Sequence, residues 1–363
     1  MSTNLIIGLG NTGTNIIKAL SIDPLFSKTK LYAVDSTTTN ATIDDHGFTY
    51  VSIISDEAQG SGRNRERGAA MYRYHEGNGD FDEMYANAMD AKAPVLVITS
   101  AAGGTGSGSV VPLCESLIEN GITPIPIIIF PNDADPIAYH LNANDLLLEL
   151  GEIGVSTYSI FVNPANTADY TPINNEVIDL IKIVFGYKYI PTTLDSIDDS
   201  DLNTILSTPG RFIAFSVKET NADRMKKEVT RKLYTGYQPM WTDGEAKSCT
   251  FMKAFSLASL FADTEYEEVF YEVNSRIPNA YDEYRNIAII EDNKLAEATV
   301  MVAGLPRHKV KEIDTTFEEA TSISEGMKKS TRPNFMSRKK ATITKPSTDT
   351  NESGEVKSKF KWE

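Results

Sequence analysis

The sequence of 363 residues has few of the residues that build disulfide scaffolds and metal sites. Its two cysteines, Cys114 and Cys249, are too few for a disulfide framework, which indicates a reducing compartment and a cytoplasmic location. Its four histidines lack the spacing of metal ligands, so no zinc site is expected. Neither a G-x-S-x-G sequence nor a cysteine–histidine arrangement indicates acyl-transfer chemistry.

The sequence also lacks a long hydrophobic run. The longest apolar stretch, residues 122–131, contains three prolines and is far too short to span a bilayer. The first residues carry no basic segment, so no signal peptide is expected and no membrane partner is predicted. The formal net charge of −15 argues against a general nucleic-acid coat, because the affinity of such a protein comes from cations that neutralise phosphates. No direct sequence-specific DNA binding is expected either.

The charge is unevenly distributed along the chain. Residues 328–363 contain ten Lys or Arg and four Asp or Glu, a net charge of +6, which leaves −21 for residues 1–327. Residues 329–363 are rich in Ser, Thr, Lys and Asn, and such a segment buries too little apolar surface to offset its ordering entropy. We therefore predict a disordered basic tail, which is either a solvated segment without a role or an interaction tail anchored by Phe360 and Trp362.

Strand and helix patterns alternate in the first part of the chain. Helices are expected over residues 14–20 and 113–119. This alternation predicts a doubly wound α/β domain over residues 1–205, with ligands bound at the carboxyl ends of the strands. The strands are expected over residues 4–8, 30–35, 94–100, 123–130 and 156–162.

After residue 205 the pattern indicates a smaller α+β domain that extends over residues 206–306. One helix is expected over residues 221–232, and an apolar stripe predicts a final long helix over residues 307–328. Strands are expected over residues 211–217, 248–256, 269–274, 286–290 and 298–303.

The first glycine loop, GLGNTG at residues 8–13, follows a strand and precedes a helix. Asp35 lies 22 positions beyond Gly13, so the pattern is typical of a dinucleotide-binding loop and keeps an NAD-dependent oxidoreductase open as an alternative. A lone G-x-G-x-x-G is equally typical of ordinary turn glycines.

The second glycine loop, SAAGGTGSGS at residues 100–109, is more specific. Four glycines in six positions allow backbone N–H groups to converge on an anion, and the helix that follows favours negative charge at its start. No lysine follows, which excludes a Walker A loop. Two phosphate loops on one sheet fit a triphosphate better than they fit a dinucleotide.

GGTGSGS at residues 103–109 resembles the signature loop of the tubulin/FtsZ superfamily, and further segments resemble the other loops of that family in order along residues 3–306. GLGNTGTN resembles its first loop, AVDST at residues 33–37 its second and GSGRN at residues 60–64 its third. The resemblance implies a tubulin/FtsZ-like fold that binds GTP or GDP with Mg²⁺. The loop residues that it implies for nucleotide binding are Gly10, Asn11, Thr12, Gly13, Asn15, Asp35, Ser36, Gly62, Arg63, Asn64, Ala102, Gly103, Gly104, Thr105, Gly106 and Ser107.

The resemblance extends to the expected base and ribose contacts. Asn163 corresponds to the asparagine at a strand end that contacts the base or ribose. Asn175 resembles the guanine-reading asparagine of the family's central helix, and Asn174 or Asn163 is the alternative reader. The candidates for ribose contact and for packing on the base are Asp133, Asp135 and Tyr170.

The pair Asp198 and Asp201 resembles the synergy loop of the family, the D-x-x-D element after the central helix. In isolation, these residues would indicate an ordinary acidic helix cap. The resemblance implies that they act catalytically in trans on the nucleotide of the next subunit, so that GTP hydrolysis is coupled to the growth of a head-to-tail homopolymer filament.

The short connection after Asn163, the expected last helix and the basic tail resemble the TubZ proteins of plasmid and phage partition systems. This resemblance implies a filament that moves DNA through a DNA-binding adaptor protein, assembled on a centromere-like site and bound by the tail. Two other readings stay open, a cell-division FtsZ-like filament and a filament that binds GTP but hardly hydrolyses it.

Overall fold

The computed structural model describes residues 4–37, 47–54, 59–91, 94–163, 169–186, 198–240, 251–258, 263–277, 280–288 and 295–308. The helix expected over residues 307–328 and the tail expected over residues 329–363 lie outside these residues, apart from Arg307 and His308. No helix in the described ranges is long and apolar enough to cross a membrane.

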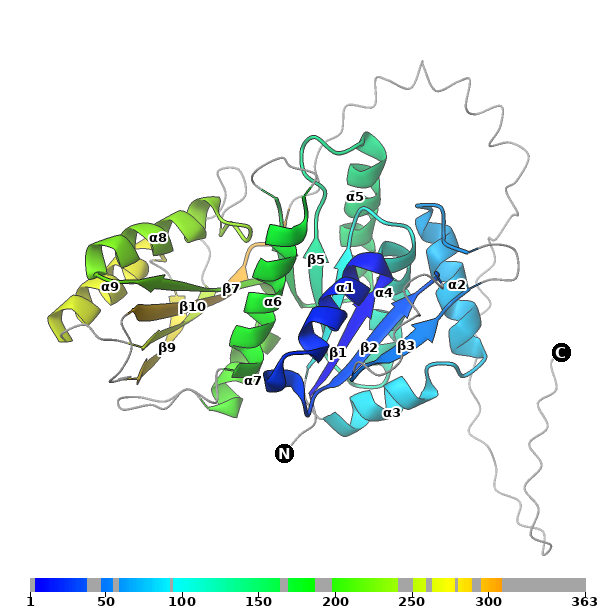
Figure 1. Cartoon of the computed structure of the whole chain (residues 1–363), viewed down its shortest axis with the longest axis horizontal. Coiled ribbons are helices and arrows are strands. Elements are labelled where there is room, and N and C mark those ends of the chain that lie inside the picture. The colour runs from blue at the N-terminus through cyan, green and yellow to red at the C-terminus, as the bar shows by residue number, and fades with distance from the viewer. Residues whose placement is uncertain are drawn as a thin grey trace, which may run out of the picture. The chain divides into compact units, whose positions relative to one another are not determined.

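Six parallel strands form the N-terminal part of the sheet (Figure 1). Their spatial order is β3-β2-β1-β4-β5-β6, which reverses direction beside β1 as a doubly wound sheet does. The prediction of such a sheet is therefore confirmed. The strands are β1 (Leu5–Leu9), β2 (Lys30–Asp35), β3 (Thr49–Ser52), β4 (Val95–Ser100), β5 (Pro124–Ile129) and β6 (Thr157–Phe161).

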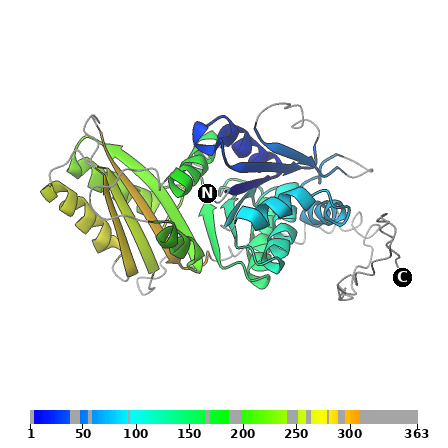
Figure 2. The ribbon, with the colours of Figure 1, turned by 90° about the horizontal axis from the view of Figure 1, so that it is seen from below.

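Helices cover both faces of these strands (Figure 2). Successive strand residues point to opposite faces, so Ile6 joins one hydrophobic core while Leu5 and Ile7 join the other. The first core packs under α1 (Gly10–Ser21) and α6 (Thr171–Gly186). The second packs under α2 (Arg65–Gly77), α3 (Asp82–Ala91), α4 (Thr105–Glu119) and α5 (Ile137–Glu152).

The sheet continues past β6 without a break. β7 (Gly210–Glu219) pairs with β6 in parallel, and β10 (Ala296–Leu305), β8 (Phe251–Ala258) and β9 (Ala280–Ala288) complete ten strands. A third core joins this part of the sheet to α8 (Ala222–Thr235) and α9 (Asp263–Arg276). The smaller α+β region is thus present, while a domain boundary at residue 205 stays a prediction.

Two expectations for the C-terminal part were wrong. The strand expected over residues 269–274 lies inside α9, whose buried residues Tyr266, Val269, Phe270 and Val273 follow the spacing of a helix face. The strand expected from residue 286 begins six residues earlier, at Ala280. Polar residues dominate this start of β9, so no apolar pattern marked it.

Candidate nucleotide site

A cleft of about 240 Å³ lies where β1, β2 and β4 end. Four loops line it. Three of them follow β1, β2 and β4 directly, and the fourth lies between β3 and α2. The carboxyl ends of parallel strands meet at one edge of a sheet, which explains how residues far apart in sequence come together here. The lining residues are Leu9, Gly10, Asn11, Thr12, Asp35, Ser36, Thr37, Gly60, Ser61, Arg63, Ser100, Gly103, Gly104, Thr105 and Gly106.

A chain of hydroxyl groups ties three of these loops together. The Oγ atom of Ser36 lies 2.6 Å from Oγ1 of Thr105, and Thr105 Oγ1 donates to Ser61 Oγ at 3.1 Å. Asp35 is only 2% exposed and accepts hydrogen bonds from the Ser36 amide at 2.8 Å and from the Thr37 hydroxyl at 3.3 Å. Asp35 therefore holds the turn that presents Ser36 to the cleft.

The glycines of the second loop divide into two kinds. A Cβ atom at Gly104 would lie 2.2 Å from Ser61 Oγ, and a Cβ at Gly106 would lie 2.6 Å from the Leu9 carbonyl oxygen. These glycines are required because neighbouring loops pack directly on their backbone. Gly103 differs, because a Cβ there would meet nothing within 4 Å. Its backbone faces open space in the cleft, which is the geometry of a cradle for a ligand.

Two helices begin in the cleft without a capping side chain. α1 begins at Gly10 and α4 at Thr105, and neither N-cap residue makes a side-chain hydrogen bond. By contrast, Asn64 caps α2, Asp198 caps α7 (Asp199–Ser207) and Asn221 caps α8. Uncapped N–H groups and the positive ends of two helix dipoles favour an anion with several negative oxygens, such as a polyphosphate.

The third loop presents a fixed cation. Among the described residues Arg63 is the one non-glycine residue with positive φ, at 63°, and its guanidinium lies 5.0 Å from the centre of the Tyr139 ring. Asn142 donates to the Arg63 and Ala102 carbonyl oxygens at 3.3 and 3.1 Å. These contacts hold the loop against the start of α5.

Arg65 makes a connection that the sequence did not indicate. Its guanidinium binds Glu149 of α5 at 3.0 and 2.8 Å and donates to Ser107 Oγ at 2.8 Å. Ser107 is therefore engaged in joining α2 to α4, although the sequence assigned it to the nucleotide. Partners 84 residues apart carry no local sequence signal.

The expected base contacts lie around the first turn of α6. The Tyr170 hydroxyl donates to Asp135 at 2.5 Å, and burial together with this carboxylate raises the pKa of Tyr170. The Oδ1 atom of Asn174 is buried and finds no hydrogen-bond partner among the described residues. Asn175 is exposed, whereas Asn163 is only 4% exposed.

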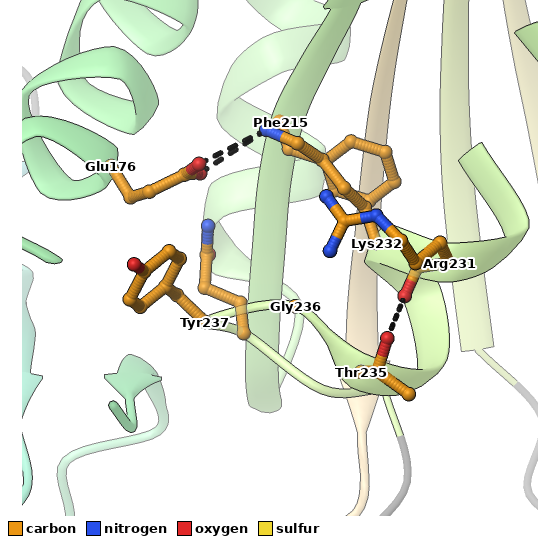
Figure 3. Close-up of a pocket in the computed structure, with 8 residues that line it drawn as sticks. Glu176, Phe215, Arg231, Lys232, Thr235, Gly236 and Tyr237 are labelled. Atoms are coloured by element: carbon orange, nitrogen blue, oxygen red, sulfur yellow. Dashed lines mark hydrogen bonds and ion pairs between the residues drawn. The ribbon is translucent and has the colours of Figure 1, made fainter. Parts of the chain in front are cut away.

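Elements of the C-terminal part reach this same region. Lys232 of α8 lies 3.1 and 3.3 Å from the two carboxylate oxygens of Glu176 on α6 (Figure 3). The amide of Val162, next to Asn163, donates to the Tyr237 carbonyl oxygen at 2.8 Å. The segment around Lys232 and Tyr237 thus contacts both elements that carry the expected base-reading asparagines.

The structure gathers many of the predicted nucleotide-binding residues in the cleft, and the sequence missed Leu9, Thr37, Gly60, Ser61 and Ser100. All five lie inside the recognised loop segments, at residues 8–13, 33–37, 60–64 and 100–109, so the segments carried a signal although these individual residues were not assigned. The predicted residues that line the cleft are Gly10, Asn11, Thr12, Asp35, Ser36, Arg63, Gly103, Gly104, Thr105 and Gly106. Those absent from its described lining are Gly13, Asn15, Gly62, Asn64, Ala102, Ser107, Asp133, Asp135, Asn163, Tyr170, Asn174 and Asn175.

Asp198 and Asp201 lie at the opposite edge of the sheet. They form a capping box, in which Asp198 accepts from the Asp201 amide at 2.9 Å and Asp201 accepts from the Asp198 amide at 3.1 Å. Other residues of α7 line a second cleft with Pro94 and Thr123, which directly precede β4 and β5. The two aspartates therefore lie at the far end of the strands from the cleft of their own chain (Figure 1).

No protein-family model and no curated protein matches the sequence. The structure is similar to the GTPγS-bound protofilament of CetZ2 from Haloferax volcanii, with a TM-score of 0.69, 16% identity and coverage of 90% of this chain and 99% of that chain. An empty FtsZ dimer from M. jannaschii matches with a TM-score of 0.66, 17% identity and coverage of 86% and 94%. A GTPγS-form protofilament of Bacillus thuringiensis serovar israelensis TubZ matches with a TM-score of 0.67, 14% identity and coverage of 90% and 94%.

The chain therefore has the tubulin/FtsZ fold that the glycine loops predicted. CetZ, FtsZ and TubZ structures match about equally well, so the expected similarity to TubZ in particular stays a prediction.

Proposed function

We propose that this chain is a GTPase that assembles head to tail into filaments. The observation that carries the proposal is the cleft in which α1 and α4 begin, with uncapped helix starts and the open backbone of Gly103. This arrangement supports the binding of a polyphosphate. Two solved structures with a similar fold are a GTPγS-bound CetZ2 protofilament and a GTPγS-form TubZ protofilament, which favours GTP as the nucleotide.

For the guanine base we assign the reading role to Asn174 rather than to Asn175. A buried amide oxygen without a partner is costly, and a donor from a ligand would remove that cost. Guanine offers N–H donors of the kind that an asparagine Oδ1 accepts. Asn175 is exposed on the neighbouring face of the helix turn, so it is less suited to a desolvated contact.

Mg²⁺ fits the donor chemistry of the cleft as a companion of the nucleotide. No group of three or more His, Cys, Asp or Glu residues gathers in the described part of the chain to hold a metal. Mg²⁺ commonly takes few protein ligands together with substrate phosphates, and hydroxyl oxygens such as that of Thr105 suit it. When bound, it would neutralise negative charge on the phosphates.

The position of Asp198 and Asp201 favours hydrolysis between subunits. Two carboxylates at the opposite end of the strands are far from the phosphates of their own chain, and head-to-tail stacking would bring them to the next subunit's cleft. There a carboxylate would take a proton from water as the water oxygen attacks the γ-phosphorus. The bond to the bridging oxygen breaks, and GDP and phosphate leave.

The test compares assembly with turnover. Asp201→Asn keeps a side-chain acceptor for the capping box but removes the base, so filaments should form with GTP and Mg²⁺ while phosphate release falls at least about 100-fold. Electron microscopy and phosphate release above and below the assembly concentration measure the two effects. Asp179→Asn, on the exposed face of α6, is the matched control and should behave as the parent.

Two results would contradict the proposal. Tight NAD binding without GTP binding would favour the oxidoreductase instead. If Asp201→Asn hydrolyses GTP at the rate of the parent protein, Asp201 has no catalytic role.

We also propose that the filament works in the cytoplasm and carries DNA through an adaptor protein bound by residues 329–363. The support is the net charge of +6 on residues 328–363 against −21 on the rest, which suits electrostatic capture of a partner. Co-sedimentation of filaments lacking residues 329–363 with an adaptor–DNA complex tests this. Full recruitment of the adaptor–DNA complex without these residues would show that the adaptor binds elsewhere on the filament. A role of the filament in cell division would favour the FtsZ-like alternative over DNA transport.

A further inference from the structure

We propose that the first turns of α5, carrying Ile137 and Leu141, insert into the cleft beside α7 of the next copy of this chain. The inference rests on the proposed head-to-tail assembly and names the surfaces that make it. We call the edge of the sheet with the glycine loops the nucleotide end, and the opposite edge with α7 the α7 end.

The cleft at the α7 end has a volume of about 570 Å³. One side is apolar, with Ala88, Pro94 and Ile122 beside Met89, which is 52% exposed. The other side is formed by small polar side chains of α7. The described lining residues include no charged side chain, so an apolar group can enter without desolvating an ion.

The nucleotide end offers apolar side chains to fill such a cleft. Ile137 is 52% exposed and Leu141 is 42% exposed, and their spacing places both on one face of α5. Asn142 binds the Arg63 and Ala102 carbonyl oxygens, which fixes this part of α5 beside the glycine loops. The apolar pair therefore lies at the surface that head-to-tail stacking would bring against the α7 end.

Charge favours the same pairing. The exposed residues Asp90 and Glu119 each adjoin lining residues of the cleft at the α7 end, and Asp198 is exposed at the start of α7. The nucleotide end presents exposed Arg63, held in place over Tyr139. A cation that is already ordered loses little entropy on pairing. A fixed arginine facing an acidic rim supports a second copy of this chain as the occupant.

Complementary patches at opposite ends of one chain make a heterologous contact that does not close on itself. Such a contact adds subunits in a line, as a filament requires. It also brings the start of α7, with its two aspartates, toward the loops that surround Gly103 in the next copy. The apolar insertion would then set the distance between carboxylates and phosphates.

The experiment uses one variant for each end. Leu141→Asp changes the nucleotide end and Met89→Asp the α7 end, and both side chains are exposed, so the fold should tolerate them. The control is Leu148→Asp, which is 55% exposed on the same face of α5 and about 10 Å further from the nucleotide end. GTP binding is measured for every variant, and assembly is followed by sedimentation and electron microscopy.

Leu141→Asp and Met89→Asp should each raise the assembly concentration at least about tenfold while binding GTP as the parent does. Leu148→Asp should assemble within about twofold of the parent. An equimolar mixture of the two end variants retains one intact contact, so it should give dimers in analytical ultracentrifugation but no filaments.

Assembly of both end variants at the parent concentration would overturn this inference and leave the proposed function intact. The absence of dimers from the mixture would also overturn it. If the two end variants assemble normally but no longer recruit the adaptor–DNA complex, the cleft binds a different protein and this inference is wrong. A parent chain that binds no GTP and forms no filaments would instead overturn the proposed function, on which this contact depends.

Discussion

The start of α7 and the starts of α1 and α4 lie at opposite ends of the N-terminal strands, and they differ in how their first N–H groups find acceptors. Every helix begins with backbone N–H groups that need acceptors. At the α7 end, Asp198 and Asp201 supply the acceptors from their own side chains. At the nucleotide end, α1 and α4 begin without any side-chain cap, and the backbone of Gly103, just before α4, faces open space. Asn64 caps α2 at this same end. α5 also begins without a side-chain cap, after Pro136 and outside the described lining of the cleft, so it is the missing cap together with a position in the cleft that marks the starts of α1 and α4 for a ligand.

This comparison also separates glycines that the sequence could not tell apart. Gly104 and Gly106 allow loops to pack, whereas Gly103 leaves the cleft open. Substitution of the first kind should damage folding, and substitution of the second kind should damage binding alone. The predictions below use that contrast.

Gly106→Ala should have the largest effect on stability. Its Cβ would lie 2.6 Å from the Leu9 carbonyl oxygen and 2.7 Å from Thr99 Oγ1, so backbone must move. We expect a loss of about 1–3 kcal/mol in the free energy of unfolding, measured by urea denaturation. Gly77→Ala is the control, because its Cβ would meet nothing within 4 Å and it lies in α2. Equal stability of the two variants would contradict the packing role.

Gly103→Ala should leave the stability of the fold unchanged and weaken the binding of the nucleotide. The added methyl group meets no protein atom, so the free energy of unfolding should change by less than about 0.5 kcal/mol. It would occupy space that we assign to the phosphates, and GTP affinity should fall about tenfold in a titration. Parent affinity in this variant would show that the ligand does not approach Gly103.

Much of the nucleotide end could be predicted because its signals are local. The glycine loops follow buried strands directly, and strand, loop and helix start lie within a few residues of each other. The parallel sheet then brings together loops that were predicted separately. Ser36, Ser61 and Thr105 illustrate the limit, since each loop was recognisable but their shared hydroxyl contacts were not.

The parts that could not be predicted depend on distance along the chain or on helix rotation. The Arg65–Glu149 pair connects residues that only the packing of α2 and α5 against α4 brings together. One residue along a helix turns the side chain by about 100°, so the sequence could not decide between Asn174 and Asn175. The misassigned segment in α9 is rich in β-branched and aromatic residues, and tertiary packing outweighed that preference.

Asp198→Ala should destabilise the fold less than Gly106→Ala does, and it completes the comparison at the α7 end. Asp198 accepts from the Ser200 and Asp201 amides at 2.8 and 2.9 Å, so its loss leaves two N–H groups to solvent. We expect the free energy of unfolding to fall by about 1 kcal/mol, the usual value of an N-cap. Asp198→Asn keeps the acceptor oxygen and should be as stable as the parent in the same urea titration.

The two Asp198 variants together separate capping from catalysis. If Asp198 acts on the nucleotide of the next subunit, Asp198→Asn should retain stability yet lose GTP turnover, because an amide cannot take a proton from water. Asp179→Ala, on the exposed face of α6, controls for the removal of a negative charge. An Asp198→Asn variant as unstable as Asp198→Ala would mean that charge at the helix start, rather than the hydrogen bond, holds α7 in place.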